Sequence, residues 1–523
     1  MLRFYCFQNF HSGLCFIFLP EYPAGKFTKQ KHFAIFVTSQ THHSKHMKKL
    51  HIICIALFLL GVIFPVYADS TIKVACVGNS ITYGAFIPKR EINSYPAQLQ
   101  TYLGSKYEVR NFGVSGCTLL KQGDFPYTST DSYQASLAFQ PDIVFIKLGT
   151  NDSKPQNRIY LQQFKTDYLR LIESYCNLPA RPRIILLTPI RCFLPDNTGI
   201  SDSVIQTGIT PVIKQIAYEQ NLEIINLYYL FGDQWQEKLI PDKLHPSSEG
   251  ASMIASRLYT YLTSQTIVGQ DIISRFPLSP VREFNFHGFQ GYVYNNQGIE
   301  YYIVKPHRTA THVPWIWRAR FWGHEPQTDL ALLEQGFHLT YCNVANLYGS
   351  PEAVKRWNNF YKLAIQAGLN KKVALEGMSR GGLIVYNWAA ANPGKVACIY
   401  ADAPVMDFKS WPLGKGASSG SAEDTRLLLT AYGFSNEQQA LKWKKNPIDH
   451  AGKLAKAGIP ILHVVGDADE VVPVKENTDI FAKRLKGRHY TFQVIHKPGI
   501  GHHPHSLNNP QPITEFILNH TIY

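Results

Sequence analysis

Two serines of this chain lie on glycine-flanked segments, where a tight turn exposes a side chain. Ser80 lies in GNSITYG and Ser379 lies in GMSRG. A serine hydroxyl attacks a carbonyl at neutral pH only when a base takes its proton, a carboxylate orients that base and donors stabilise the oxyanion. If both serines react, the sequence must supply these partners twice.

The segments that follow Ser80 contain each kind of partner. NFG ends in Gly113, GTND contains Asn151, and DKLHP contains Asp242 and His245, three residues apart. Each residue alone has an ordinary structural explanation, since an asparagine often caps a helix and a histidine before proline often lies in a surface loop. The four segments together supply a nucleophile, oxyanion donors, an acid and a base.

These segments also resemble a known family. GNSIT, NFGVSG, GTND and DKLHP, in this order, are similar to the four blocks of the SGNH (GDSL-like) hydrolases, over about residues 70–264. The resemblance implies Ser80 as the nucleophile, His245 as the base and Asp242 as the acid that orients the base.

The same resemblance implies an oxyanion hole. Its donors are the backbone amides of Ser80 and Gly113 and the side-chain amide of Asn151. Asn79 stands where the family usually has aspartate. This position is outside the triad, so we expect the departure to have a small effect.

The second serine has a different setting. GMSRG fits G-x-S-x-G between an apolar segment, KVALE, and a helical one, GGLIVYNW, which is the context of a nucleophile elbow. Asp469 follows the next-to-last apolar segment and His502 follows the last. The chain order Ser379, Asp469, His502 is that of the α/β-hydrolases, and residues 281–523 resemble that fold.

Two other acids compete with Asp469. Asp467 is two residues away, but the spacing D-x-x-V-P favours Asp469. Asp402 ends an earlier apolar segment and stays open as the alternative acid, because some triads take their carboxylate from that strand.

Two other histidines, His503 and His505, compete with His502. The glycine turn directly before His502 favours it as the base. Three histidines in one segment also suggest a metal site, but no second ligand cluster with suitable spacing accompanies them. We therefore assign neither a metal nor a cofactor.

Arg380 follows the second serine, and its amide is the expected oxyanion donor. No HGGG segment supplies the other donor, so Trp322 and Gly323 are its expected source. The Ser-Arg pair is similar to the G-C-S-R-x-G pattern of glucuronoyl esterases, where an arginine can contact the oxyanion or a uronate. A surface salt bridge is the alternative role for Arg380.

The elements around these residues alternate between apolar strands and amphipathic helices. Strands are expected at 71–78, 142–149, 183–189 and 222–228, with helical stretches such as 161–175 between them. This alternation predicts an α/β fold with a parallel sheet covered on both faces. The family resemblance implies a flavodoxin-like SGNH three-layer sandwich, with catalytic groups at the carboxyl ends of the strands.

A second sheet is expected further along the chain. Residues 284–304 predict an antiparallel hairpin around Asn295–Gly298, and strand-helix alternation then resumes in an α/β-hydrolase fold. Residues 412–450 form a polar, helical insertion that suits a lid. The aromatic residues near 315–322 suit either sugar stacking or packing in the core.

The first 68 residues have a separate character. From Met47, two lysines precede a short apolar run and a small-x-small site at Val66–Ala68, as in a secretory signal peptide. A membrane anchor is the alternative, although the run is short for one. The expected domains are a wrongly assigned N-terminal extension at 1–46, a signal peptide at 47–68, an SGNH esterase domain at 69–264, a linker at 265–280 and an α/β-hydrolase domain at 281–523.

Charge and cysteines say less about function. The chain has a net charge of +14, and removing the net +6 of residues 1–68 leaves +8. This basic excess suits an anionic polysaccharide or a membrane surface, although solubility alone also explains it. Six cysteines lie after residue 68; Cys176 and Cys192 are the nearest pair, and buried apolar thiols are the alternative to disulfides.

We therefore expect a periplasmic or secreted serine ester hydrolase with two catalytic domains. The domain pair resembles carbohydrate esterases of Bacteroidetes, which implies removal of acetyl groups by the first domain. The second would cleave an acetyl or a uronate methyl or other ester. The expected partner is an acylated plant polysaccharide or oligosaccharide, with no nucleic acid and no stable membrane span in the mature chain.

Two alternatives remain open. The second domain has the elbow and triad order of serine peptidases of the prolyl-oligopeptidase type, although those commonly carry a β-propeller ahead of the hydrolase. One domain would otherwise bind glycan without catalysis, and the two complete sets of triad residues argue against this.

Overall fold

The computed structural model describes most of the chain after residue 70. The described residues are 71–521, apart from 198, 233–241, 268–270 and 488–489. The expected extension at 1–46 and signal peptide at 47–68 lie outside the described residues. Within the described ranges, no helix combines the length and the apolar character that a membrane span needs.

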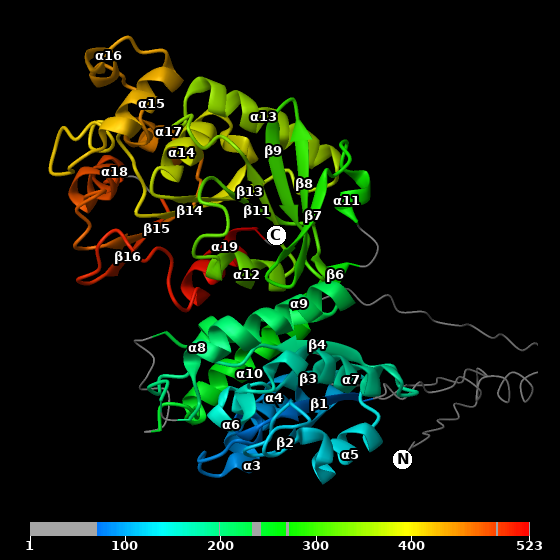
Figure 1. The fold of residues 1–523 in the computed structure, drawn as a ribbon. Helices are drawn as coiled ribbons and strands as arrows, with labels where there is room; N and C mark the ends of the chain where they lie inside the picture. Colours follow the sequence, from blue (N-terminus) through cyan, green and yellow to red (C-terminus); the bar gives the residue numbers. More distant parts are fainter. Residues whose placement is uncertain (1–70, 198, 233–241, 268–270, 488–489, 522–523) are drawn as a thin grey trace, which may run out of the picture. The chain divides into compact units, whose positions relative to one another are not determined.

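A five-stranded parallel sheet forms the centre of the first domain (Figure 1). Its strands, in spatial order, are β2 (Tyr107–Gly113), β1 (Ile72–Gly78), β3 (Ile143–Lys147), β4 (Arg183–Leu187) and β5 (Glu223–Ile225). This 2-1-3-4-5 order is the flavodoxin-like arrangement. The predicted α/β sheet is therefore confirmed.

Helices cover both faces of this sheet because successive strand side chains point to opposite sides. Val74 and Cys76 of β1 share a core with α4 (Tyr95–Leu103) and α10 (Ser248–Thr263). Ala75 and Val77 share the opposite core with α7 (Phe164–Cys176) and α9 (Thr210–Gln220). The shorter helices of this domain are α2 (Ser80–Tyr83), α3 (Arg90–Asn93), α5 (Asp131–Ala138), α6 (Pro155–Arg158) and α8 (Asp202–Val204).

A nine-stranded sheet forms the centre of the second domain. Its strands, in spatial order, are β16 (Phe492–Lys497), β15 (Ile461–Gly466), β14 (Val396–Asp402), β13 (Val373–Met378), β11 (Trp315–Arg318), β12 (His338–Cys342), β9 (Ile299–Val304), β8 (Phe289–Asn296) and β7 (Arg282–Phe286). The first six are parallel, and β7, β8 and β9 form an antiparallel meander at one edge. The predicted edge hairpin is therefore confirmed.

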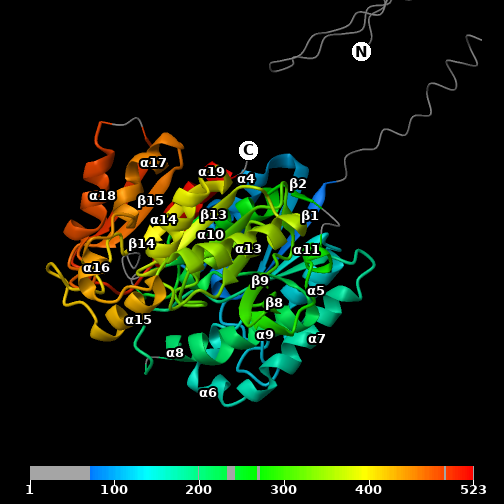
Figure 2. The same ribbon diagram turned by 90° about the horizontal axis from the view of Figure 1, so that it is seen from above.

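Helices also lie on both faces of the second sheet (Figure 2). One face packs against α13 (Pro351–Gln366), α14 (Gly381–Ala391), α17 (Ala451–Lys456) and α18 (Thr478–Leu485), and the other against α12 (Gln327–Glu334) and α19 (Gln511–Thr521). Trp315 and Trp317 are fully buried, and the Trp317 ring stacks on Trp357 with centroids 4.0 Å apart. These tryptophans pack the core and do not form a sugar platform.

The segment expected as a linker, 265–280, contains secondary structure in its described residues, 265–267 and 271–280. β6 (Thr266–Ile267) pairs with β10 (Thr309–Ala310), and α11 (Ile272–Arg275) follows. Phe276 is buried with its ring centroid 4.4 Å from that of Tyr294. The core of the second domain therefore begins before residue 281, because apolar side chains of the segment are buried in it.

The helical insertion carries α15 (Ala422–Tyr432) and α16 (Glu437–Leu441). Leu428 of the insertion forms a small core with Phe408 and Trp411, which precede the insertion, and with Tyr348 and Leu383. Leu383 belongs to the first turn of α14, so the insertion packs directly against the helix that follows the second serine.

The described cysteines form no disulfide. Cys176 is exposed, whereas Cys76, Cys117, Cys192, Cys342 and Cys398 are buried and free. The interpretation as buried apolar thiols holds for those five.

Lys147 ends β3 with its side chain fully buried, and its ammonium nitrogen has no hydrogen-bond partner among the described residues. Burial lowers the pKa of Lys147 from 10.5 to about 7, against a smaller opposing effect of Cys117. Between these two values the unfolded chain binds a proton that the folded protein does not, so stability falls as the pH falls from about 10 toward 7.

We expect Lys147→Met to raise the free energy of unfolding at pH 7 by an amount on the order of 4 kcal/mol. The gain should shrink toward pH 10, where the unfolded lysine also becomes neutral. Urea unfolding at both pH values measures the effect, with Lys106→Met as an exposed control. A gain that did not change with pH would contradict burial of a neutral amine.

Candidate functional sites

Ser80 lies at the carboxyl end of β1, where it begins α2. The Asn79 side-chain oxygen accepts a hydrogen bond from the Ile81 amide at 3.2 Å and caps the helix. This contact gives the departure from the family pattern at residue 79 a structural role. The Ser80 side chain is nearly buried, with its hydroxyl facing the loop that carries His245.

The three residues of the first predicted triad lie next to one another. The Ser80 Oγ lies 2.8 Å from Nε2 of His245, and Nδ1 of His245 lies 2.5 Å from Oδ2 of Asp242. The other carboxylate oxygen, Oδ1, accepts hydrogen bonds from the backbone amides of Leu244 and His245 at 3.0 and 3.1 Å. This geometry holds Nε2 of His245 in position to accept the serine proton.

The carboxyl group of Asp242 is kept ionised by these contacts. Burial by itself raises its pKa, but the hydrogen bonds from the His245 ring and the two backbone amides outweigh burial and bring the pKa below its ordinary value. An ionised acid fixes the tautomer of His245 and stabilises the imidazolium that forms when the ring takes a proton.

Asn151 reaches the same region from the carboxyl end of β3. Its side-chain amide donates to the Cys117 carbonyl at 2.9 Å, and the Cys117 thiol lies 3.5 Å from the Gly78 carbonyl. The loop after β2 therefore lies between Asn151 and the turn that carries Ser80.

The predicted donor Gly113 does not fit the hole. Its amide donates to the side-chain oxygen of Asn111 at 2.9 Å, and a Cβ at this position would lie 2.2 Å from the Tyr83 nitrogen. Close approach of β2 to α2 thus explains this glycine. Gly116, further along the same loop, has a left-handed φ of +83°, and its amide makes no hydrogen bond to a described residue. Gly116 is not among the donors expected from the sequence, although it is the second glycine of NFGVSG.

Ser379 occupies a sharp turn between β13 and α14. Its φ of +49° lies in the left-handed region, which is rare for a residue with a Cβ. Gly377 lets the turn close, because a Cβ there would lie 2.9 Å from Val385 Cγ2 and 3.1 Å from the Gly381 backbone. The structure therefore has the strained elbow that G-x-S-x-G predicts.

The second predicted triad also comes together. The Ser379 Oγ lies 3.0 Å from Nε2 of His502, and Nδ1 of His502 lies 2.7 Å from Oδ2 of Asp469. Oδ1 of Asp469 accepts from the amides of Val471 and Val472 at 2.9 and 2.8 Å. Asp469 is thus the acid beside the base.

The alternative acid, Asp402, contacts a different histidine. Its Oδ1 lies 2.7 Å from Nδ1 of His505, and its Oδ2 accepts from the Ser506 amide at 2.8 Å. Asp467 lies 2.6 Å from His496. Neither carboxylate contacts His502, so the alternative assignment to Asp402 is wrong by geometry.

Arg380 is half-buried beside the elbow. Its guanidinium pairs with Asp424 of α15 and lies 5.6–5.9 Å from the ring centroids of Phe321, Tyr348 and Trp411. The ion pair expected as an alternative is therefore present, but it ties the elbow to the insertion instead of lying free on the surface.

The segment after β11 approaches the elbow through Arg320. A Cβ on Gly381 would lie 3.4 Å from Arg320 Cβ and 3.8 Å from its nitrogen. Trp322 instead packs on Phe286 and Tyr302, with ring centroids 5.1 Å away. Arg320 thus lies against the start of α14, whereas the Trp322 ring, at the expected source, packs on β7 and β9.

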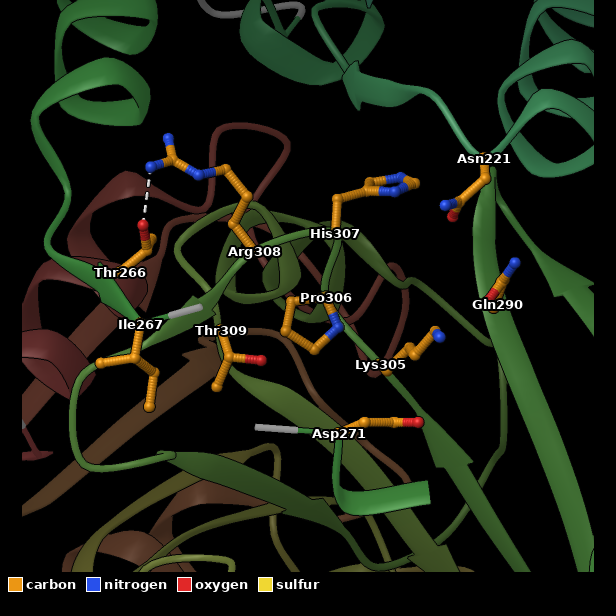
Figure 3. Close-up of a pocket in the computed structure, with 10 residues that line it drawn as sticks. All are labelled: Asn221, Thr266, Ile267, Asp271, Gln290, Lys305, Pro306, His307, Arg308 and Thr309. Carbon is orange, nitrogen blue, oxygen red and sulfur yellow. Dashed lines mark hydrogen bonds between the residues drawn. The ribbon is translucent and has the colours of Figure 1, made fainter. Parts of the chain in front are cut away.

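A separate cavity of about 390 Å³ lies away from these residues (Figure 3). Arg308, which lines the cavity, donates a hydrogen bond to the Thr266 hydroxyl at 2.6 Å. Lys305 and His307 also line the cavity. None of the six triad residues lines this cavity, so we assign it no catalytic role.

Two families match the chain. Residues 76–253 match the GDSL-like Lipase/Acylhydrolase family and residues 360–521 match the Prolyl oligopeptidase family. The chain thus carries a GDSL/SGNH-type hydrolase domain followed by an α/β-hydrolase domain. Each match contains the serine, the acid and the histidine that the structure brings together in that domain.

One relative is a protein named acetylxylan esterase from Xylanibacter ruminicola, 41% identical over 208 residues. The match covers 36% of this chain and 43% of that protein, so it spans less than half of the relative's length. Solved structures similar to parts of the chain include a carbohydrate acetylesterase from Sinorhizobium meliloti (17% identical, TM-score 0.30, 36% of this chain and 98% of that one). Another is an S-formylglutathione hydrolase from Agrobacterium tumefaciens (14% identical, TM-score 0.35, 46% and 97%).

The assignment of the second acid can be tested directly. We expect Asp469→Asn to slow fluorophosphonate labelling of Ser379 by about 10³-fold or more, because His502 loses the partner that fixes its tautomer. Mass spectrometry of the Ser379 peptide measures the rate.

Asp402→Asn is the matched control, since it leaves the bond between Asp469 and His502 in place. Thermal unfolding of both variants separates slow labelling from loss of the fold. Equal slowing in two folded variants would contradict the assignment of Asp469.

Proposed function

We propose that this protein is a two-domain serine ester hydrolase that acts on acylated plant polysaccharide or its oligosaccharides. The first domain would remove acetyl groups, and the second would cleave another ester, either acetyl or the methyl or other ester of a uronic acid. The observation that carries the proposal is the presence of two complete triads, each with its serine within 3.0 Å of its histidine.

In the first domain, Ser80 Oγ attacks the acetyl carbonyl carbon while Nε2 of His245 takes the hydroxyl proton. The oxyanion that forms receives hydrogen bonds from the Ser80 amide, the Asn151 side chain and the Gly116 amide. Collapse breaks the bond to the sugar oxygen, which leaves with the proton from His245. Water then attacks the acetyl-enzyme, with His245 as base again, and acetate departs.

Two features support an acetylated glycan as the first substrate. The relative named acetylxylan esterase shares 41% identity over 208 residues, and residues 76–253 match an acylhydrolase family. In addition, Phe86 is 71% exposed with its ring centroid 5.1 Å from that of His245. An exposed aromatic ring beside the base offers a flat apolar surface on which a sugar ring can stack.

The surroundings of Ser379 support a different ester for the second domain. Arg320 and Arg380 both lie beside the elbow, and Nε of Arg320 is buried without a hydrogen-bond partner among the described residues. Burial, with added repulsion from Arg380, lowers the pKa of Arg320. A carboxylate or ester oxygen of a uronic acid beside these two guanidinium groups would offset their mutual repulsion, whereas a neutral acetylated sugar would do so less.

A serine peptidase is the second candidate for the second domain. The match of residues 360–521 to the Prolyl oligopeptidase family favours it. The six strands β11 to β16 and the triad serve either reaction, because acyl transfer from an ester and from an amide uses the same serine, histidine and oxyanion donors. A glycan-binding domain without catalysis is less well supported, since both triads are assembled.

The remaining expectations are also proposals. A polysaccharide substrate requires the enzyme to meet it outside the cytoplasm, so we place the protein in the periplasm or outside the cell. The proposed reactions need only the side chains, backbone amides and water, and thus no cofactor. A net charge of +8 after residue 68 suits a glycan that carries uronates.

The serines can be separated by Ser80→Ala, Ser379→Ala and the double variant. We expect Ser80→Ala to lower the rate of acetate release from acetylated xylan by a factor of about 10³ or more. Ser379→Ala should retain most of that rate. Methyl-esterified uronic acids and acetylated pectin should show the opposite dependence. Acetate and methanol release measure the two activities.

A proline-containing peptide substrate completes the design. Cleavage that depends on Ser379, with no ester hydrolysed by that site, would favour the peptidase. Full acetate release by a folded Ser80→Ala variant would contradict the assignment of the first site.

The oxyanion hole makes a further prediction. We expect Asn151→Ala to lower kcat for acetate release by about 10²–10³-fold with little change in KM, because the donor acts mainly on the charge of the transition state. Gln156→Ala removes an exposed amide five residues away and serves as the control. A change in KM alone would mean that Asn151 binds the ground state instead.

A further inference from the structure

Three histidines crowd around the base of the second triad. The ring centroids of His502, His503 and His505 are 5.0, 4.9 and 4.7 Å apart, and the ring planes meet at 76–80°. One ring nitrogen of each lies within 4.8 Å of the others. The ring centroids thus form a nearly equilateral triangle, and one nitrogen of each ring lies as close to the others as the centroids do.

This triangle has the dimensions of a three-histidine metal site. Zinc binds imidazole nitrogen at about 2.0–2.1 Å with tetrahedral angles, which puts the centroids of three ligating rings about 5 Å apart. The observed separations are slightly shorter. Three nitrogens on one tetrahedral zinc lie about 3.3 Å apart, so the rings would have to turn to bring their nitrogens from within 4.8 Å of one another to that separation.

Buried carboxylates already orient two of the three rings. Asp402 holds Nδ1 of His505 at 2.7 Å, and Asp469 holds Nδ1 of His502 at 2.7 Å. A carboxylate on one nitrogen of a histidine is the usual outer partner of a metal ligand, because it fixes the ring and makes the other nitrogen more basic. His503 is exposed and completes the triangle from the solvent side.

A fourth ring lies next to the triangle. The centroid of His324 is 6.0 Å from that of His503 and 5.9 Å from that of His505. His324 comes from the loop after β11, far from the other three in sequence. The sequence shows no second ligand cluster and so predicts no metal, whereas the fold supplies a further histidine from a separate segment.

We propose that His502, His503 and His505 bind a transition-metal cation of the zinc type, and that the bound cation inhibits the second active site. Nδ1 of His502 is held by Asp469 and its Nε2 by Ser379. Whichever nitrogen the cation takes, one bond of the triad is lost. Metal-bound and reactive forms of the site are thus mutually exclusive, and the inhibition rests on the proposed catalytic role of this triad.

The first triad provides an internal control in the same chain. Among the described residues, the only aromatic ring in contact with His245 is Phe86, and no other histidine lies beside it. Zinc should therefore leave Ser80 reactive under conditions that block Ser379.

The test measures fluorophosphonate labelling of both serines by mass spectrometry during titration with Zn²⁺ alone, followed by excess EDTA. We expect micromolar Zn²⁺ to slow labelling of Ser379 by about tenfold or more, with recovery in EDTA and no change at Ser80. Equal slowing at both serines, or none at Ser379, would overturn the proposal.

His503→Ala separates metal binding from the triad, because it removes one ligand and none of the triad residues. We expect it to raise the Zn²⁺ concentration for half-inhibition at least about tenfold. His496→Ala, which removes an exposed histidine outside the triangle, should leave that concentration unchanged. Equal zinc sensitivity of the unmodified protein, His503→Ala and His496→Ala would contradict the proposed metal site.

Binding can also be measured without any reaction. Co²⁺ held by three imidazoles in a tetrahedral site gives strong visible absorption, which we expect in the unmodified chain and in Ser379→Ala but not in His503→Ala. The Co²⁺ absorption does not require Ser379 to hydrolyse an ester. It therefore distinguishes an error in the proposed function from an error in the proposed metal site. Absence of the spectrum in the unmodified chain would overturn the proposal.

Discussion

Both candidate sites depend on a carboxylate that is itself held still by the backbone. An imidazole can take the serine proton at Nε2 only if its other nitrogen carries the hydrogen, and an ionised acid on Nδ1 enforces this tautomer. Asp242 and Asp469 do so in the same way: Oδ2 holds the histidine, and Oδ1 accepts the amides two and three residues further along. The tight turn after each aspartate therefore sets the direction of the carboxylate before the histidine is positioned.

The acid and the base are close in sequence in the first domain and far apart in sequence in the second. Asp242 and His245 share one turn, so the acid and the base are placed together by local structure. Asp469 and His502 follow β15 and β16, and only the parallel pairing of these strands brings them side by side. A disturbance of the sheet edge would thus separate the second acid from its base, whereas the first pair would move as a unit.

The nucleophiles differ in a similar way. Ser80 opens a helix that Asn79 caps, and its backbone needs no unusual conformation. Ser379 has a φ of +49°, which costs about 1–3 kcal/mol for a non-glycine residue. Its amide donates to the Asp402 carbonyl at 2.8 Å, and its carbonyl accepts from Val405 at 2.9 Å. These bonds to the neighbouring strand end hold the strained residue, so the elbow depends on β14 as well as on its own glycines.

What the sequence predicts well are residues whose role follows from order along the chain. The sheets, both serines, both histidines and Asp242 were all identifiable because strand ends and short spacings bring them together. The Gly113 amide was misassigned because Asn111 folds back to accept its hydrogen bond, and no pattern of residue types reveals such a local competitor. The role of Arg380 is equally hard to predict from the sequence, because its partner Asp424 lies in an insertion more than forty residues away. Only the packed structure distinguishes a free arginine from one that is already paired.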